Sequence, residues 1–336
     1  MKKIITVNGA VPLSECRMVL SHEHFFIDLT NQKAAGASLR PLRKSDYEKM
    51  MIDPYSMQDN LLMDDFQTAV NECLPLLEYG CNTAVDCTTP EIGRNPEQLR
   101  ALALKANLNI VMGCGYYTAD THFDKFASMS VEEACEDLTA RVTNGENGIF
   151  PGIIGEIGTS KEILPNEEKA LIAAAAAHRA SNLAIQVHIY PWSDNGLKAL
   201  DILESHGVPP SKIVICHSDV EPQWGYIKSL LSAGVYVELD NFGKEFTPAA
   251  NSFAGGNFIK DTERVKLAAG IIDEGFGSQL LLTNDICLKC MLSQFGGNGY
   301  KHIFANILPM IEKCGIDGNY LKNTVMRENP LNMLAV

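Results

Sequence analysis

Two histidines separated by one residue, His22 and His24, are the first side chains in the chain that suggest chemistry. They follow an apolar run that begins at Met18 and predicts a β-strand. On an extended strand, residues i and i+2 point to the same side, so both imidazoles face one way and Glu23 faces the other. Two neutral imidazoles on one rigid wall form half of a site for zinc or a similar divalent metal. Taken alone, the pair fits an ordinary structural role equally well.

Four more polar residues lie at or just after the ends of other predicted strands, which makes six candidate ligands: His22, His24, Glu156, His188, His217 and Asp285. Each could singly be a structural group, but six exceed the ligands of one tetrahedral zinc with an open position. They suit two metal ions roughly 4 Å apart. We expect the first two histidines and Asp285 to hold one ion. His188 and His217 would hold the other, with Glu156 as the bridge.

A centre of this kind is suited to hydrolysis. Metal binding lowers the pKa of a water molecule to roughly 7, which supplies a nucleophile at neutral pH. Asp285 would then be the catalytic residue that takes the proton during attack and passes it to the leaving atom.

The elements needed to gather these side chains are present in the sequence. Eight apolar runs predict strands, at residues 16–24, 82–88, 109–114, 152–157, 183–189, 212–217, 235–239 and 279–283. Helical sequence follows each of them, the first over residues 61–78, and this alternation predicts a (β/α)8 TIM barrel in the α/β class. The candidate ligands then fall at the C-terminal ends of the strands, where barrel active sites are built. A doubly wound sheet is the alternative, but no Gly-rich phosphate loop follows the first long strand.

A short hairpin should precede the barrel, because Asn8-Gly9 separates two apolar runs and is a strong two-residue hairpin signal. No linker divides the chain, so we predict one domain over residues 1–336. The net charge of −13 argues against nucleic acid and anionic membranes as partners. No apolar run approaches the ~18 residues that a membrane span needs. These features indicate a cytoplasmic protein acting on a small-molecule substrate, and the ten scattered cysteines do not form a disulfide pattern.

Seven short motifs carry a further signal: VNG at 7–9, LSHEH at 20–24, VDCTTP at 85–90, IGR at 92–94, GCGYY at 113–117, GEIGTS at 155–160 and ENP at 328–330. With these motifs the chain resembles the phosphotriesterase family of the amidohydrolase superfamily over nearly its whole length. The resemblance implies that the six candidate ligands bind two divalent ions, most often zinc, with manganese and cobalt as alternatives. It also implies a homodimer. The best-known members bridge the metals with a carbamylated lysine, where this chain has Glu156.

The family includes lactonases, phospho-sugar lactonases and organophosphate hydrolases, so the resemblance implies a metal-dependent hydrolase acting on ester bonds. We expect a lactonase or carboxylic esterase. Tyr117 matches a substrate-pocket tyrosine of the lactonase-like members. Many of these carry an arginine after strand 7, where this chain has Asn241. Lys244 could supply a substrate-binding cation nearby, although a solvated loop lysine is the simpler interpretation.

Several cations and a glycine-rich loop suggest that the substrate is a phosphorylated or otherwise anionic sugar lactone. They are Lys244, the loop at residues 296–299, and Arg40, Arg43 and Lys44 in the polar segment after strand 1. Backbone N–H groups of glycine-rich loops can cradle an anion, and a lysine adds a point charge. The alternatives are a phosphoester or amide hydrolase of the same superfamily, or a binding protein without turnover, which would predict the loss of a ligand. A PHP-like or deaminase-like barrel would need further histidines near strand 7.

Overall fold

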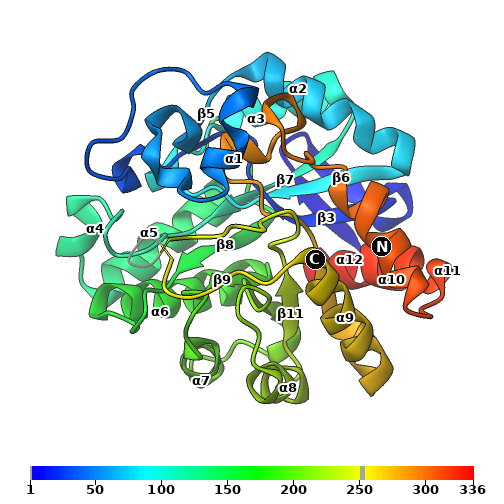
Figure 1. Ribbon diagram of the computed structural model, residues 1–336. Coiled ribbons are helices and arrows are strands. Elements are labelled where there is room, and N and C mark those ends of the chain that lie inside the picture. Colours follow the sequence, from blue (N-terminus) through cyan, green and yellow to red (C-terminus); the bar gives the residue numbers. More distant parts are fainter. Residues whose placement is uncertain (1, 250–253) are drawn as a thin grey trace.

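The computed structural model describes residues 2–249 and 254–336. Its centre is a barrel of eight parallel strands: β3 (Met18–Glu23), β6 (Cys81–Asp86), β7 (Asn109–Cys114), β8 (Ile153–Gly158), β9 (Ile185–His188), β10 (Ile213–Ile215), β11 (Tyr236–Leu239) and β12 (Leu280–Leu282). They neighbour one another in chain order from β3 to β12. The first and last strands meet where the Thr283 hydroxyl and the Asp285 N–H both donate to the His22 carbonyl, at 3.0 and 3.2 Å. The predicted barrel is confirmed (Figure 1).

Helices lie between the strands and cover the outside of the barrel (Figure 1). They are α1 (Tyr47–Met50), α2 (Phe66–Cys73), α3 (Pro96–Ala106), α4 (Asp124–Ser128), α5 (Val131–Asn144), α6 (Pro165–Ser181), α7 (Asn195–Ser205), α8 (Trp224–Ala233), α9 (Asp261–Ile271), α10 (Leu308–Lys313), α11 (Gly318–Tyr320) and α12 (Asn329–Leu334). None of the helices within the described ranges is long and apolar enough to cross a membrane.

The first predicted helix is shorter than expected. The helix was expected to start at residue 61, but the chain there forms β5 (Leu62–Met63), which pairs with β4 (Ile27–Asp28). Helix α2 then begins after Asp65, whose carboxylate accepts from the Thr68 N–H at 2.6 Å. It ends at Cys73, because Pro75 cannot donate a backbone hydrogen bond and the chain tightens there. The pairing of β4 with β5 anchors the long segment that rises over the barrel between them.

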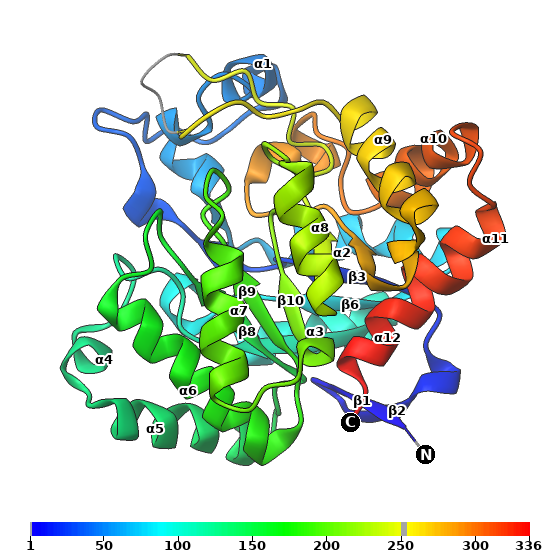
Figure 2. The ribbon, with the colours of Figure 1, turned by 90° about the horizontal axis from the view of Figure 1, so that it is seen from below.

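Apolar side chains fill the barrel interior and close one of its ends. One buried cluster takes residues from the inner face of the strands: Val19, Val85, Val111, Ile153, Val214 and Leu281. Ile4 of the N-terminal hairpin and Met333 of α12 belong to the same cluster. The hairpin itself, β1 (Lys3–Thr6) with β2 (Gly9–Pro12), forms as predicted. Figure 2 shows it beside the C-terminus, at the end of the barrel opposite to α1 and the long loops. The hairpin end is therefore sealed, and the end with the long loops is left for a site.

Candidate active site

The six candidate ligands meet at the open end of the barrel. His22 is on β3, Glu156 on β8 and His188 on β9, whereas the other three lie one to three residues after the end of a strand. All are buried except His188, whose side chain is 15% exposed. Their ligand atoms form two groups, each within 4.8 Å: one contains His22, His24 and Asp285, and the other Glu156, His188 and His217. The sequence predicted the same neighbours, with Glu156 between the two groups, and the binding of metal by these residues stays a prediction.

Within the first group, Asp285 lies between the two histidines. Its Oδ1 atom is 3.1 Å from Nε2 of His24 and 3.6 Å from Nε2 of His22. Burial by itself raises the pKa of Asp285, but the Lys244 ammonium and the two imidazoles outweigh burial and hold the pKa below its usual range. The carboxylate is therefore ionised and available as a ligand.

Glu156 has the position expected of a bridge. Its Oε1 atom is 3.2 Å from Nδ1 of His188, 3.2 Å from Nε2 of His217 and 3.4 Å from Nε2 of His22. Its Oε2 atom lies 3.9 Å from Nε2 of His24. One carboxylate thus faces both groups at once. Burial raises the pKa of Glu156, yet the surrounding imidazoles lower it by more, so this carboxylate is also ionised.

The donor set fits divalent metal ions. Nε2 of His22 is buried and has no hydrogen-bond partner among the described residues, although buried ring nitrogens normally have one. Nδ1 of His188 and Nε2 of His217 point at each other across 2.8 Å. Nitrogen and carboxylate oxygen atoms that converge in this way match the ligands that zinc and other divalent first-row transition metals prefer.

Three of the candidate ligand histidines are each held by a hydrogen bond at Nδ1, on the side of the ring away from the centre. Nδ1 of His22 lies 3.0 Å from Glu238, Nδ1 of His217 lies 3.0 Å from Asp240, and Nδ1 of His24 lies 2.9 Å from the Thr88 hydroxyl. Such partners fix the tautomer and the ring orientation of a metal ligand. In all three rings this leaves Nε2 directed at the centre.

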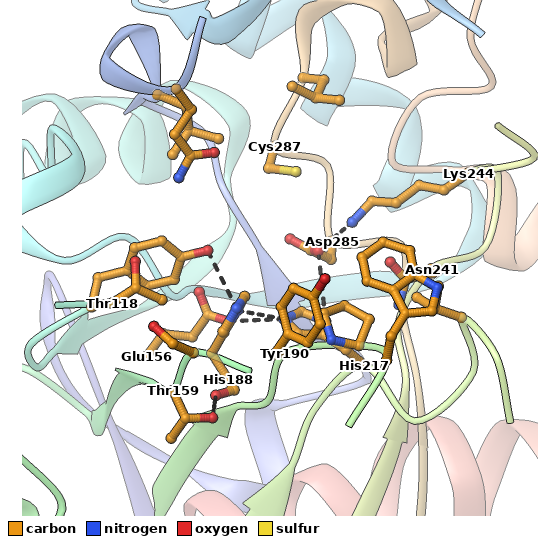
Figure 3. Close-up of a pocket in the computed structure, with 18 of the residues that line it drawn as sticks. Thr118, Glu156, Thr159, His188, Tyr190, His217, Asn241, Lys244, Asp285 and Cys287 are labelled. Carbon is orange, nitrogen blue, oxygen red and sulfur yellow. Dashed lines mark hydrogen bonds and ion pairs between the residues drawn. The ribbon is translucent and has the colours of Figure 1, made fainter. Parts of the chain in front are cut away.

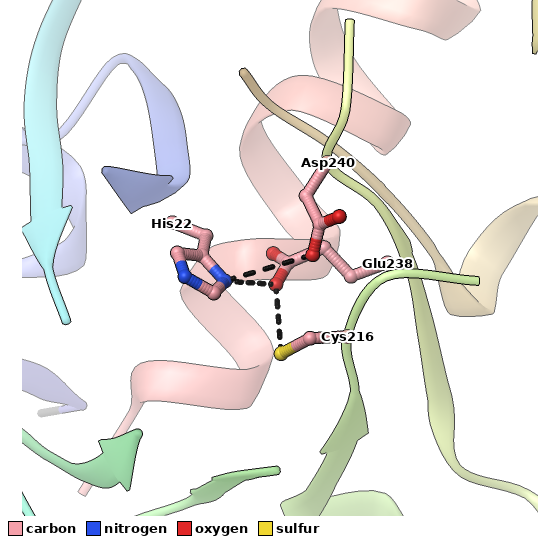
Figure 4. A group of neighbouring side chains, drawn as sticks. All are labelled: His22, Cys216, Glu238 and Asp240. Carbon is pink, nitrogen blue, oxygen red and sulfur yellow. Dashed lines mark hydrogen bonds and ion pairs between the residues drawn. The ribbon is translucent and has the colours of Figure 1, made fainter. Parts of the chain in front are cut away.

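Glu238 makes the most hydrogen bonds of these partners, and Figure 4 shows its contacts with His22 and Cys216. Besides His22 it accepts hydrogen bonds from the Ser21 hydroxyl at 2.6 Å, the Gln186 amide at 2.7 Å and the Cys216 thiol at 3.4 Å. Sequence reasoning did not identify it. The available signal was a glutamate inside the apolar run at residues 235–239, since a buried charged side chain requires partners.

Glu23 points away from the centre, as the strand pattern predicted, but it still serves the site. This buried carboxylate accepts from the Thr283 hydroxyl, the Asn284 N–H and side-chain amide, and the Ile286 N–H, at 2.7 to 3.0 Å. It thereby fixes the turn that carries Asp285. Its place between two candidate ligands was the only signal for this role in the sequence.

A cavity of about 400 Å³ opens above the centre and is lined by Glu156, His188, His217 and Asp285. Tyr117 and Lys244 line it too, and their role in substrate binding stays a prediction. The Tyr117 hydroxyl is 3.4 Å from Nδ1 of His188. Figure 3 shows the Lys244 ammonium reaching Asp285, with which it forms a buried ion pair. The interpretation of Lys244 as a solvated loop lysine is therefore wrong, because the side chain is only 6% exposed.

Asn241, which takes the place of the family arginine, does not reach into the cavity as a free donor. Its amide nitrogen donates to Asp219 and Asp240, at 2.8 and 2.6 Å. It therefore supports the carboxylate that holds His217.

The wider anion site predicted from the sequence is wrong. Arg40 is exposed and donates to Asp46, and neither Arg43 nor Lys44 lines the cavity. In the loop at residues 296–299, the N–H groups of Gly296, Gly297 and Gly299 are bonded to backbone carbonyls within the turn. That loop lines a separate pocket of only about 10 Å³. These N–H groups and the Arg40 guanidinium are therefore already hydrogen-bonded to nearby residues, and an anion would have to compete for them.

Comparisons with known proteins cover nearly the whole chain. The model of the phosphotriesterase family matches residues 2–334. A protein of Danio rerio named N-acetyltaurine hydrolase is 31% identical over 345 residues, which cover 99% of this chain and 98% of that protein. The solved structure of a resiniferatoxin-binding protein from Rhodobacter sphaeroides matches with a TM-score of 0.92 at 29% identity, covering 99% of this chain and 94% of that one.

A lactonase from Listeria monocytogenes has the same fold. Its structure matches with a TM-score of 0.79 and covers 99% of this chain and 98% of that one. The identity is 20%, so this likeness concerns the barrel alone.

Proposed function

Because the chain belongs to the phosphotriesterase family, we propose that it is a binuclear metal-dependent hydrolase that cleaves the amide bond of a small N-acyl compound with an anionic amine part. The observation that carries this proposal is the convergence of six candidate ligands, five of them buried, in two groups beneath a cavity of about 400 Å³. The relative named N-acetyltaurine hydrolase, similar over its full length, supports the choice of an amide.

An ester was the first expectation from the sequence, with an amide as the alternative. A lactone or carboxylic ester stays as the second candidate. It is favoured by Tyr117, which lines the cavity and matches a pocket residue of the lactonase-like members. The same centre would attack either carbonyl, because both reactions pass through a tetrahedral intermediate with a charged oxygen.

Two divalent ions, when bound, would polarise the scissile carbonyl and activate a water molecule for attack. The two histidines of the β3 region and Asp285 would hold one ion, and His188 and His217 the other. Glu156 would bridge them, since its carboxylate faces both groups. Zinc suits this mixture of nitrogen and oxygen ligands, and manganese or cobalt are alternatives.

Asp285 carries the proton. It takes the proton that water releases as the new C–O bond forms, and it delivers that proton to the amide nitrogen as the C–N bond breaks. An amide needs this second step, because an unprotonated amine anion is a very poor leaving group. The products are a carboxylic acid and an amine.

Lys244 and Tyr117 position the substrate. The hydrogen bond that the structure gives the Lys244 ammonium goes to Asp285, and an ammonium has three donors in all. Because Lys244 also lines the cavity, the other donors would be available to a carboxylate or sulfonate of the substrate. Tyr117 presents its hydroxyl beside His188, where it can hydrogen-bond a polar group above the centre.

The test is a substrate panel with zinc- and manganese-loaded protein. It should contain N-acetyltaurine, a neutral N-acetyl amine of equal length, a sugar lactone with and without phosphate, and a phosphotriester. We expect metal-dependent release of acetate from N-acetyltaurine, with the neutral amide cleaved less efficiently. Turnover of lactones without any turnover of amides would contradict the amide assignment and favour the ester.

A further inference from the structure

One side of the cavity is built from aromatic rings that the proposed reaction does not use. Tyr190 and Trp192 belong to the loop after β9, and Phe246 and Phe258 to the segment between β11 and α9. The rings form a continuous chain of edge-to-face contacts. The centroids of Tyr190 and Trp192 are 5.4 Å apart, those of Trp192 and Phe258 5.4 Å, and those of Phe258 and Phe246 5.2 Å. We refer to these four residues as the aromatic wall.

The aromatic wall is held in place, and three of its four rings keep part of their surface exposed. The Trp192 indole N–H donates to the Asn257 carbonyl at 3.3 Å. The backbone lies directly against the rings, since a Cβ atom added at Gly255 would come within 2.1 Å of the Tyr190 hydroxyl oxygen. One added at Gly256 would come within 2.4 Å of Cδ1 of Trp192. Nevertheless Tyr190, Trp192 and Phe258 remain only half-buried where they line the cavity. Fixed rings that keep apolar surface open to a cavity are suited to a ligand rather than to the core.

The proposed substrate has two parts, and only one of them suits an apolar surface. Its amine part is small and charged, and a charge is not readily desolvated against aromatic carbon. The acyl group is the apolar part. A cavity of about 400 Å³ lies within the range of ~300–1,000 Å³ that encloses drug-sized ligands, so it exceeds what an acetyl group needs.

We infer that the aromatic wall is an acyl-group subsite, and that the substrate is an N-acyl amide whose acyl group carries an aromatic ring, of the phenylacetyl type. The inference rests on the proposed function and refines its substrate class. Aromatic rings prefer offset or edge-to-face contacts at centroid separations of ~4.5–7 Å. A further ring of the substrate would extend the series that the wall already forms.

The chain offers a direct probe of this subsite, because Trp192 and Trp224 are its two tryptophans. Trp224 begins α8 on the surface and is 37% exposed. In Trp224→Phe, all tryptophan emission comes from Trp192. Metal-loaded Trp224→Phe is titrated with phenylacetate and, separately, with acetate. We expect phenylacetate to change the emission saturably, at a concentration at least ~10-fold lower than acetate, since even one methylene in an apolar pocket is worth ~10–200-fold.

The matched control is Trp192→Phe, in which Trp224 is the only reporter and its emission should not respond. If phenylacetate leaves the emission of Trp192 unchanged, or acts no better than acetate, the subsite is wrong. This titration requires no turnover, so it tests the subsite even if the enzyme cleaves no amide at all.

Kinetics provide the second measurement. The ratio of kcat/KM for N-phenylacetyltaurine to that for N-acetyltaurine should exceed one in the native enzyme. It should fall by at least ~10-fold in Trp192→Ala and in Phe258→Ala. It should stay unchanged in Trp224→Ala, and N-acetyltaurine serves as the internal reference for correct folding. Turnover of both amides with a ratio that Trp192→Ala and Phe258→Ala leave unchanged would refute the subsite while the proposed function stands.

Discussion

The cavity has a floor, formed by the candidate metal ligands, and a mouth, formed by the aromatic wall. Different kinds of contact stabilise each of them. At the floor, His22 and His217 come from the strand ends and are tied by hydrogen bonds to the unexposed carboxylates Glu238 and Asp240. At the mouth, the half-buried rings of Tyr190 and Trp192 come from a loop and meet edge to face. Carboxylate-tied imidazoles have one satisfactory orientation, because any rotation leaves a buried charge without its donor. Ring contacts are weaker and less directional.

This difference separates two tasks within one cavity. In the proposed function the floor sets the reaction, because it fixes where the candidate ligand atoms and the proposed proton carrier lie. In the proposed subsite the mouth selects the substrate, because its apolar surface can be enlarged or reduced without disturbing any buried charge. Changes at the floor should therefore affect kcat and metal affinity for every substrate. Changes at the mouth should affect the ratio between substrates.

The largest effect is expected from Asp285→Asn. The substitution removes the proposed proton carrier but keeps the shape of the side chain, so kcat should fall at least ~100-fold, the lower limit for losing a general base. KM should change much less, because Asp285 acts on the chemical step. Steady-state kinetics on metal-loaded protein measure both. Asp120→Asn, at the exposed rim of the same cavity, is the control, and near-normal kcat in Asp285→Asn with full metal content would refute the role.

Glu238→Gln should act through the metal. The neutral amide is a poorer acceptor for Nδ1 of His22, so zinc affinity should weaken by ~10–100-fold, as is typical when the outer partner of a ligand histidine is lost. Competition with a chromogenic chelator measures the affinity directly, and zinc content at saturation should still approach two ions per chain. Glu204→Gln on the surface of α7 is the matched control. A third ion per chain in the native protein would instead mean that His22, Cys216, Glu238 and Asp240 are themselves a metal site.

Lys244→Met tests the boundary between floor and mouth. Loss of the ammonium should raise KM for an anionic N-acyl substrate about tenfold, the effect of one charge-assisted hydrogen bond. KM for the neutral amide of equal length should change less. Lys161→Met, which removes an exposed cation from the rim, provides the comparison. Equal losses for both substrates would mean that Lys244 serves Asp285 and not the anion.

The last prediction is that bicarbonate has no effect on the recovery of activity. Metal-free protein reconstituted with zinc should recover activity equally well with and without bicarbonate, because a glutamate bridge forms without carbon dioxide. A strong bicarbonate requirement would show that a carbamylated lysine, and not Glu156, bridges the two ions.

The sequence was sufficient for the barrel and for the expectation that the six candidate ligands lie close together. Strand periodicity and chain order are local properties, and parallel strands in a barrel bring their C-terminal ends to one face. Once eight strands were recognised, the histidines and carboxylates at their ends had to be neighbours. The same argument failed for the first helix, where the pairing of residues 62–63 with residues 27–28 overrode helical spacing.

Tertiary structure alone decided how the remaining charged residues are used. Lys244 could be read as a loop lysine until its ion pair with Asp285, 41 positions away, was seen. Glu238 meets Ser21 across 217 positions of sequence, and no local pattern encodes such a contact. Conversely, Arg40 does not serve the cavity, because it pairs with Asp46, only six residues along the chain. A charged side chain takes whichever partner the fold brings within reach, because its interaction energy falls with distance in space and not with separation in sequence.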